Sequence, residues 1–319
     1  RADSLNLFAM KLIDIHEQAT FSTHLHADIE GHTFNSMTGQ VRLDSTTMHQ
    51  PEGDYLIREI ALYSSDPEKK MLALHSDFMD ASATGYFTYQ SLASSIFHHI
   101  HHSLPTLCRT HVHNYDKQDN FCYAKREIFN AEPLQRLFLL PISTKGRATV
   151  ETYISDPTEE ITLTAKVPQV EYDGKNLTAI DLQCESGHSG ISLQAGGTYD
   201  DQNENGTDIT VNLTASAQND KINLNALWQS NPLDLFDGTF YTTVLCEPNA
   251  NGTTTFTMKS DSSLITINNS AWKLAPFTAH IDDTQTSIRD FLFKHDSTQY
   301  LSIDGSIGRD TSDTLQIDL

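Results

Sequence analysis

The stretch ITVNLTASAQNDKINLNALW, residues 209–228, carries the pattern on which the expected fold rests. Apolar side chains stand at every second position on both sides of a polar turn at 218–220, and mostly Thr, Ser and Asn stand between them. The apolar positions are Ile209, Val211, Leu213, Ala215, Ala217, Ile222, Leu224, Ala226 and Trp228. Strict alternation is typical of strands that are apolar on one face and solvated on the other. The stretch therefore predicts two successive half-apolar β-strands.

The same alternation recurs along the chain, in roughly 20 segments. Near the C-terminal end it appears in QYLSIDGSIGRDTSDTLQIDL, residues 299–319, at Leu301, Ile303, Ile307, Leu315 and Ile317. Glycines flanked by apolar residues also recur, but at irregular spacing, so no strict solenoid repeat is present. So many one-faced strands with little else predict a mostly β protein built as a sandwich, a propeller or an open groove.

Two segments show helical periodicity instead. In QSLASSIFHHIHHSL, residues 90–104, apolar residues stand four apart, Phe97 lies beside the stripe, and Pro105 follows. The stripe consists of Leu92, Ile96, Ile100 and Leu104. In NAEPLQRLFLL, residues 130–140, Asn130 can cap a helix and Pro133 suits its first turn. We therefore expect two short amphipathic helices, the second near 130–139, with a polar linker at 110–120 after the first.

The charge of the chain excludes some function classes. The 319 residues include 42 acidic and 21 basic ones, which gives a formal net charge of -21. Nucleic-acid binding and docking on anionic membranes both need clustered Lys and Arg, so neither is expected. No apolar run approaches the roughly 18 residues of a membrane-spanning helix. Both ends look cut, and we expect the chain to be a fragment whose signal or anchor lies elsewhere.

The four cysteines are Cys108, Cys122, Cys184 and Cys246, and none stands in a CxxC pair. This argues against a zinc ribbon or a redox motif. Two disulfides and four free thiols are both compatible with the sequence.

Histidines are the obvious candidates for a metal site. His98 and His102 stand one helical turn apart, which can chelate a metal, but the cluster has no acidic residue and no HExxH motif. His24, His26 and Asp28 share one face of a predicted strand, where a solvated polar face is the simpler interpretation. Residues 201–206 open like a calcium loop but lack its final Glu. We therefore predict no metal, no cofactor and no enzymatic activity.

Three longer stretches resemble the TamB branch of the AsmA-like family, in its Bacteroidetes-type form. Residues 69–107 resemble a family strand with "SDF" that leads into an amphipathic helix ending in "LP-x-L". Residues 129–177 resemble a short helix before a glycine-led strand, and residues 270–319 resemble the segment "Q-x-L-x-I-x-G-x-I". Together the resemblance covers roughly residues 35–319. Each motif is short, and it is their order that carries the likeness.

The resemblance implies an elongated, folded-over antiparallel β-sheet, that is, a taco-like groove with an apolar interior. It also implies a place in the periplasm, with an inner-membrane anchor outside this chain. The cargo would be phospholipids, held by their acyl chains, in support of outer-membrane biogenesis and protein assembly. An Omp85-type outer-membrane protein would be a partner through regions outside this chain.

On this interpretation the alternating positions line the groove: Leu213, Leu224, Trp228, Leu301, Ile303, Ile307, Leu315 and Ile317. The first helix would face the groove through Leu92, Ile96, Phe97, Ile100 and Leu104. We expect groove segments at 1–88 and 121–319, separated by the helix and linker at 89–120. The alternative is a structural or adhesive surface protein of β-sandwich domains. In that case the apolar faces would seal against each other, and cleavage at 110–120 would leave two stable halves.

Overall fold

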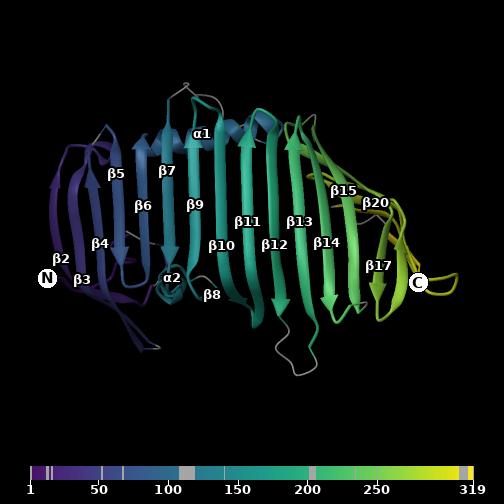
Figure 1. Cartoon of the computed structure of the whole chain (residues 1–319), viewed down its shortest axis with the longest axis horizontal. Helices are drawn as coiled ribbons and strands as arrows, with labels where there is room; N and C mark the ends of the chain where they lie inside the picture. Colours follow the sequence, from purple (N-terminus) through teal and green to yellow (C-terminus); the bar gives the residue numbers. More distant parts are fainter. Residues whose placement is uncertain are drawn as a thin grey trace. The chain divides into compact units, whose positions relative to one another are not determined.

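The computed structural model describes residues 2–11, 14–15, 17–51, 53–66, 68–107, 119–139, 141–200, 206–233, 235–249, 251–308 and 315–318, with residue 34 and the last four described by their backbone alone. Over these residues the chain is mostly β, with a large antiparallel sheet and two α-helices (Figure 1). The expected fold class is confirmed. Both helices lie where the periodicity placed them: α1 is Tyr89–Ser103 and α2 is Glu132–Phe138.

The chain divides into two compact units. Unit 1 comprises Arg1–Leu92, Gln118–Pro157 and Ala165–Gly174, and unit 2 comprises Ala93–Lys117, Thr158–Thr164 and Lys175–Leu319. Unit 1 contains β1 (Ala2–Leu5), β2 (Thr20–Glu30), a 3-10 turn (Phe34–Ser36), β3 (Thr38–Gln50), β4 (Gly53–Ser65), β5 (Lys70–Ser76), β6 (Met79–Tyr86), β7 (Phe121–Ile128), α2, β8 (Ile142–Lys145), β9 (Ala148–Ser155) and most of β10 (Glu160–Tyr172).

Unit 1 is an antiparallel meander. Each strand from β2 to β7 pairs with the next one in the sequence, and β7 then pairs with β9 (Figure 1). The expected boundary at residue 121 is therefore wrong, because β7 and β9 extend the N-terminal sheet instead of starting a second one. The predicted linker falls mostly on 108–118, which lie outside the described residues.

Unit 2 contains the greater part of α1 and β11 (Lys175–Gly187), β12 (Gly190–Asp200), β13 (Asp208–Gln218), β14 (Lys221–Asn231), β15 (Phe236–Pro248), β16 (Thr254–Ser260), β17 (Ser263–Ile267), β18 (Ser270–Leu274), β19 (Thr278–Ile281), β20 (Gln285–Lys294), β21 (Tyr300–Gly308) and β22 (Leu315–Asp318). The strands from β11 to β15 again pair in sequence order. The hairpin between β13 and β14 turns at Asn219 and Asp220, which both have positive φ. This is the turn that the opening stretch predicts.

Two strands of unit 2 are interrupted in the middle. β15 pairs with β16 through Thr242–Pro248 and with β17 through Phe236–Gly238, so β16 and β17 are two halves of one strand. In the same way β20 pairs with both β19 and β18. At the breaks the amide of Asp261 donates to the carbonyl of Tyr241, and that of Ser260 donates to the carbonyl of Phe277. The meander therefore continues across the breaks.

The hydrophobic cores of the described residues are small. In unit 1, Phe21 and Met48 pack with Ala19, and Leu137 of α2 packs against them. In unit 2, Leu274, Phe277 and Ala279 are buried beside aromatic side chains of β15 and β20. A third buried cluster of unit 2 consists of Leu104, Ala217 and Cys246. A large part of the alternating apolar surface therefore lies outside them.

Candidate functional site: two half-exposed apolar faces

One face of the sheet in unit 2 is apolar across β11 to β15. Strand register places Ala195, Leu213, Ala226 and Phe240 in one row across four strands. The next row contains Cys184, Leu193, Ala215 and Leu224. Large and small side chains alternate within each row, so that the leucines fit beside the alanines. We call this surface the unit-2 apolar face: Leu182, Cys184, Ile191, Leu193, Ala195, Ile209, Val211, Leu213, Ala215, Ala217, Ile222, Leu224, Ala226, Trp228, Phe240 and Val244.

The unit-2 apolar face is not sealed. Leu213, Leu224 and Trp228 are half-buried, and Val211 is 39% exposed. Among the members of this face on β11 to β14, Ala217 alone is fully buried. A sandwich core would bury these side chains almost completely, because protein interiors are close-packed. The positions predicted on β13 and β14 thus share one half-exposed face.

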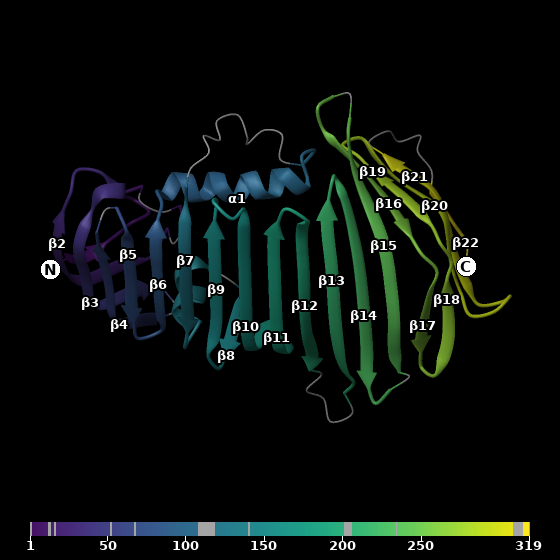
Figure 2. The same cartoon turned by 45° about the horizontal axis from the view of Figure 1, so that its top comes forward.

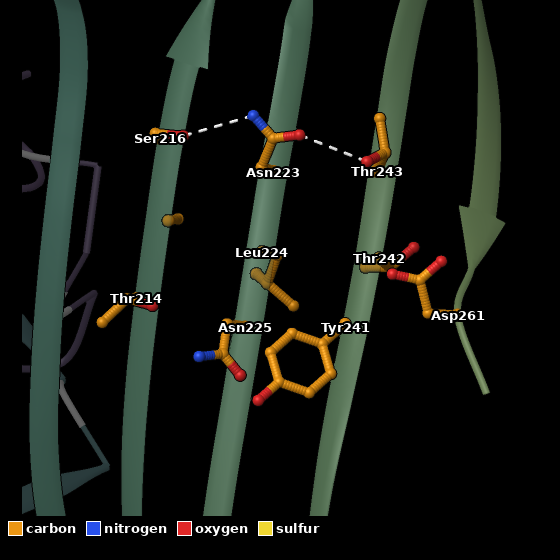
Figure 3. Close-up of a pocket in the computed structure, with 10 residues that line it drawn as sticks. Thr214, Ser216, Asn223, Leu224, Asn225, Tyr241, Thr242, Thr243 and Asp261 are labelled. Carbon is orange, nitrogen blue, oxygen red and sulfur yellow. Dashed lines mark hydrogen bonds between the residues drawn. The ribbon is translucent and has the colours of Figure 1, made fainter. Parts of the chain in front are cut away.

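The opposite face of the same strands is polar. Gln183, Gln194, Thr214 and Asn225 form the row that backs the Leu213 row. A hollow of about 300 Å³ lies along these strands, lined mostly by polar residues of β13, β14 and β15 and by Asp261, with Ala215 and Leu224 also among its lining residues (Figure 3). Asn223 donates to Ser216 at 3.3 Å and accepts from Thr243 at 3.2 Å across the strands. The rows of side chains on this face are mainly polar, whereas the rows on the other face of the same strands are mainly apolar.

Trp228 shapes the apolar face at one edge. It lies opposite Gly238 of β15. A Cβ atom at position 238 would come within 2.4 Å of Cζ2 of the indole. The ring therefore lies flat on the backbone of the neighbouring strand, in space that only glycine leaves free. Phe236 packs beside it, with a ring centroid distance of 5.8 Å.

The C-terminal end of α1 covers the other edge of this face. Leu104 is buried together with Ala217 and Cys246, and Ile191 and Ile222 pack against them. The carboxylate of Asp220 accepts hydrogen bonds from the amide and the hydroxyl of Thr106, both at 2.8 Å. The amide of Asp220 donates to the carbonyl of Ser103. The β13–β14 turn therefore holds the helix end in place, and Leu104 closes this edge.

The first helix packs through a different side from the predicted one. Ile96 and Phe97 are 40% and 39% exposed, whereas Ser95 and Ser103 are completely buried. Leu92 and Ile100 are half-buried, and Leu104 is buried. Ile96 and Phe97 therefore lie off the packed side of the helix, and their place facing a groove stays a prediction. Small serines let a helix backbone approach its neighbours closely, so the packed side follows Ser91, Ser95, His99 and Ser103.

The predicted lining positions on β21 and β22 differ in their burial. Leu301 and Ile303 are half-buried and pair in register with Phe293 and Phe291 of β20. Ile307 is 59% exposed, and its lining role stays a prediction. Among the described residues, β22 pairs with β21 at Ser302–Gly305. Leu315 and Ile317 pair with Gly305 and Ile303 at the backbone, and their side chains lie outside the described residues.

Unit 1 has an apolar face of its own, which the sequence analysis did not single out as a site. Across β3 to β6, Val41, Leu62, Leu74 and Ala81 form one row. A hollow of about 110 Å³ opens on this face between Leu62, Leu72, Leu74, Ala83, Ala124 and Arg126. We call this surface the unit-1 apolar face: Ala27, Val41, Leu43, Ile60, Leu62, Leu72, Leu74, Ala81, Ala83, Ala124 and Val150. The same period-two alternation could have revealed it.

The polar face of unit 1 is rich in ion pairs. Arg42 contacts Asp44 at 2.8 Å and Glu59 at 3.3 Å, and its hydrogen bond to Asp44 raises the pKa of the guanidinium. Lys125 lies 3.3 Å from Glu151, and hydrogen bonding to that carboxylate raises the pKa of the ammonium group. These groups are exposed to solvent, where such pairs contribute little stability. They make this face of unit 1 strongly polar.

The histidines, acidic residues and cysteines considered as metal ligands or reactive thiols form no recognisable site within the described residues. No group of three or more His, Cys, Asp or Glu is placed to hold a metal within the described residues. The possible calcium loop falls largely on 201–205, outside the described part, as does Cys108. Cys122, Cys184 and Cys246 are free thiols, and burial raises the pKa of each one. A raised pKa leaves less of the nucleophilic thiolate at neutral pH.

Comparisons with protein-family models, with curated proteins and with solved structures found no match to this chain. None of the helices in the described part of the chain has the length and apolar character needed to span a bilayer.

Proposed function

We propose that this chain is a segment of a bridge-like lipid-transfer protein that shields phospholipid acyl chains on its apolar faces. The observation that carries the proposal is that Leu213 and Leu224, in adjacent rows of the unit-2 apolar face, are only half-buried, whereas Thr214 and Asn223 on the opposite face of the same strands are exposed. Each buried methylene gains about 0.8 kcal/mol on leaving water, so such a face binds acyl chains without contacts to the headgroup. The likeness to the TamB branch supports a periplasmic location, a role in outer-membrane biogenesis and an Omp85-type partner.

The alternative, a structural or adhesive protein of sandwich domains, has less support. It requires sealed apolar faces and two halves separable at 110–120. The buried clusters are small, and unit 1 draws residues from both sides of that segment. A single cut there would divide unit 1 instead of releasing two intact domains.

The test is site-specific photocrosslinking in cells, with a crosslinking amino acid at Leu213 and a matched control at Asn212. These neighbours on β13 point to opposite faces of one strand, and Asn212 is exposed. We expect phospholipid adducts at Leu213 and none at Asn212. Folded protein without lipid at either position would overturn the proposal and favour the sandwich alternative.

A second pair of variants tests the same face without a photoreactive group. Leu213→Glu places a carboxylate among acyl-binding side chains, and Asn212→Glu places the same charge on the polar face. Because an unpaired charge next to a lipid tail must be desolvated, Leu213→Glu should abolish copurified phospholipid. Asn212→Glu should leave it unchanged. Equal lipid loading in both variants would contradict the proposed face.

A further inference from the structure

The unit-1 apolar face carries one cationic side chain where the pattern calls for an apolar one. Arg126 lies on β7 in register with Ala81 of β6 and Val150 of β9, between two members of that face. Its neighbour two residues earlier on the same face is Ala124. Arg126 also lines the hollow of about 110 Å³ together with Leu62, Leu72 and Leu74. A permanent positive charge therefore stands at an apolar depression.

Arg126 differs from the cations on the opposite face of unit 1. Arg42, Lys125 and Arg147 each lie within 4.0 Å of a carboxylate. Arg126 is exposed and has no hydrogen bond or ion pair with any described residue. This is notable in a chain with twice as many acidic as basic residues, 42 against 21. Its five N–H donors are thus free to bind an anion, for which the guanidinium fork is well shaped.

We propose that Arg126 binds the phosphate of a phospholipid whose acyl chains lie on the unit-1 apolar face. This inference rests on the proposed function and deepens it, since it names the headgroup contact. The hollow beside Arg126 is smaller than a ligand pocket of about 300 Å³ or more, so it holds only part of an acyl chain. The rest of the lipid lies along the open face. Arginine pairs with phosphate through two parallel hydrogen bonds, which fixes the position of the headgroup relative to the chains.

The test compares two lipids with the same acyl chains: phosphatidylglycerol and the corresponding diacylglycerol, which lacks the phosphate. Binding of each to the purified chain is measured by native mass spectrometry from matched detergent micelles. The wild-type chain should bind phosphatidylglycerol on the order of 10-fold more tightly, the size expected for one charge-assisted pair. Arg126→Gln should lower this ratio to about one while diacylglycerol binding stays unchanged. Arg126→Lys should keep part of the preference, since it retains the charge but not the fork.

Arg42→Gln is the matched control, because it removes an arginine from the polar face and should leave the ratio as in the wild type. Equal binding of both lipids by the wild-type chain would overturn the role of Arg126 and leave the proposed function standing. Binding of neither lipid would overturn both. Inorganic phosphate is the third probe. If it displaced the lipid completely, Arg126 would belong to a plain anion site and the inference would be wrong.

Discussion

The indole ring of Trp228 lies directly on Gly238 of the neighbouring strand, and a Cβ atom at 238 would approach Cζ2 of the ring to 2.4 Å. The contact joins β14 to β15 on the apolar face. It also explains why glycine stands within a long strand, near its start, where it is otherwise unfavourable.

Gly238→Ala should therefore destabilise the protein. The added methyl group must push the indole or the strand aside, and overpacking of this kind costs about 1–3 kcal/mol. The measurement is the urea unfolding midpoint, followed by tryptophan fluorescence. Gly187→Ala is the control, since a new Cβ there would lie 3.6 Å from the carbonyl oxygen of Glu159, an ordinary contact. Equal stability of the two variants would contradict the packing described here.

Asp220→Ala should loosen the end of α1. The substitution removes both acceptors for Thr106 and leaves alanine at φ 59°, so a loss of about 2 kcal/mol or more is expected. Hydrogen exchange should accelerate at the amides of Leu104 and Leu107. Asn219→Gly changes the same turn without touching the helix, and glycine accepts the positive φ at 219. Faster exchange in Asn219→Gly as well would show that the turn itself, and not the carboxylate, holds the helix.

Two hairpin turns should give the protein acid-sensitive stability. The carboxylate of Asp282 accepts hydrogen bonds from the hydroxyl and amide of Thr284, and that of Asp296 does the same with Thr298. These bonds lower the pKa of both carboxyl groups. A lowered folded-state pKa contributes stability that is present above the unfolded value of about 3.9 and is lost as the pH falls through the folded value.

The variant that tests this carries Asp282→Asn and Asp296→Asn together. Its unfolding midpoint should lie below that of the wild type at neutral pH, and the two should converge below about pH 4. Both carboxyl groups are exposed, so the difference should be small and should shrink further in high salt. A difference that stays constant across the pH range would exclude ionisation as its cause.

The side of α1 that packs can be tested by two substitutions at adjacent positions. Ser95 is completely buried and Ile96 is 40% exposed. Ser95→Leu should destabilise by about 1–3 kcal/mol, because no space exists for the larger side chain. Ile96→Gln should stay within about 0.5 kcal/mol of the wild type. Thermal unfolding measures both, and the reverse order of effects would restore the apolar stripe as the packed side.

Sequence alternation predicted the faces of strands well, because side-chain direction has a strict period of two. Leu213, Leu224 and Trp228 could be assigned to one face from the residue order alone. The hairpin turn at Asn219 and Asp220 followed from the same stretch. The 59% exposure of Ile307 could not be predicted in the same way, because alternation gives the direction of a side chain but not its burial.

The packed side of α1 was harder to predict from the sequence than the faces of the strands. Ile96 and Phe97 are apolar, and a stripe of residues four apart usually marks the packed side. Here close approach of the helix favours small side chains, so serines take the buried positions. The position of Arg126 on an apolar face could not be predicted from the sequence either. It follows only from the register of β6, β7 and β9.

The interrupted strands of unit 2 lie next to each other, with β16 and β17 along one line and β18 and β19 along the next (Figure 2). Their breaks, at residues 261–262 and 275–277, face each other across the pairing of the two lines. An unbroken sheet resists bending across its strands, whereas aligned breaks form a crease. Here the amides of Ser260 and Asp261 keep backbone hydrogen bonds across the crease, and the uninterrupted strands β15 and β20 lie on either side of it.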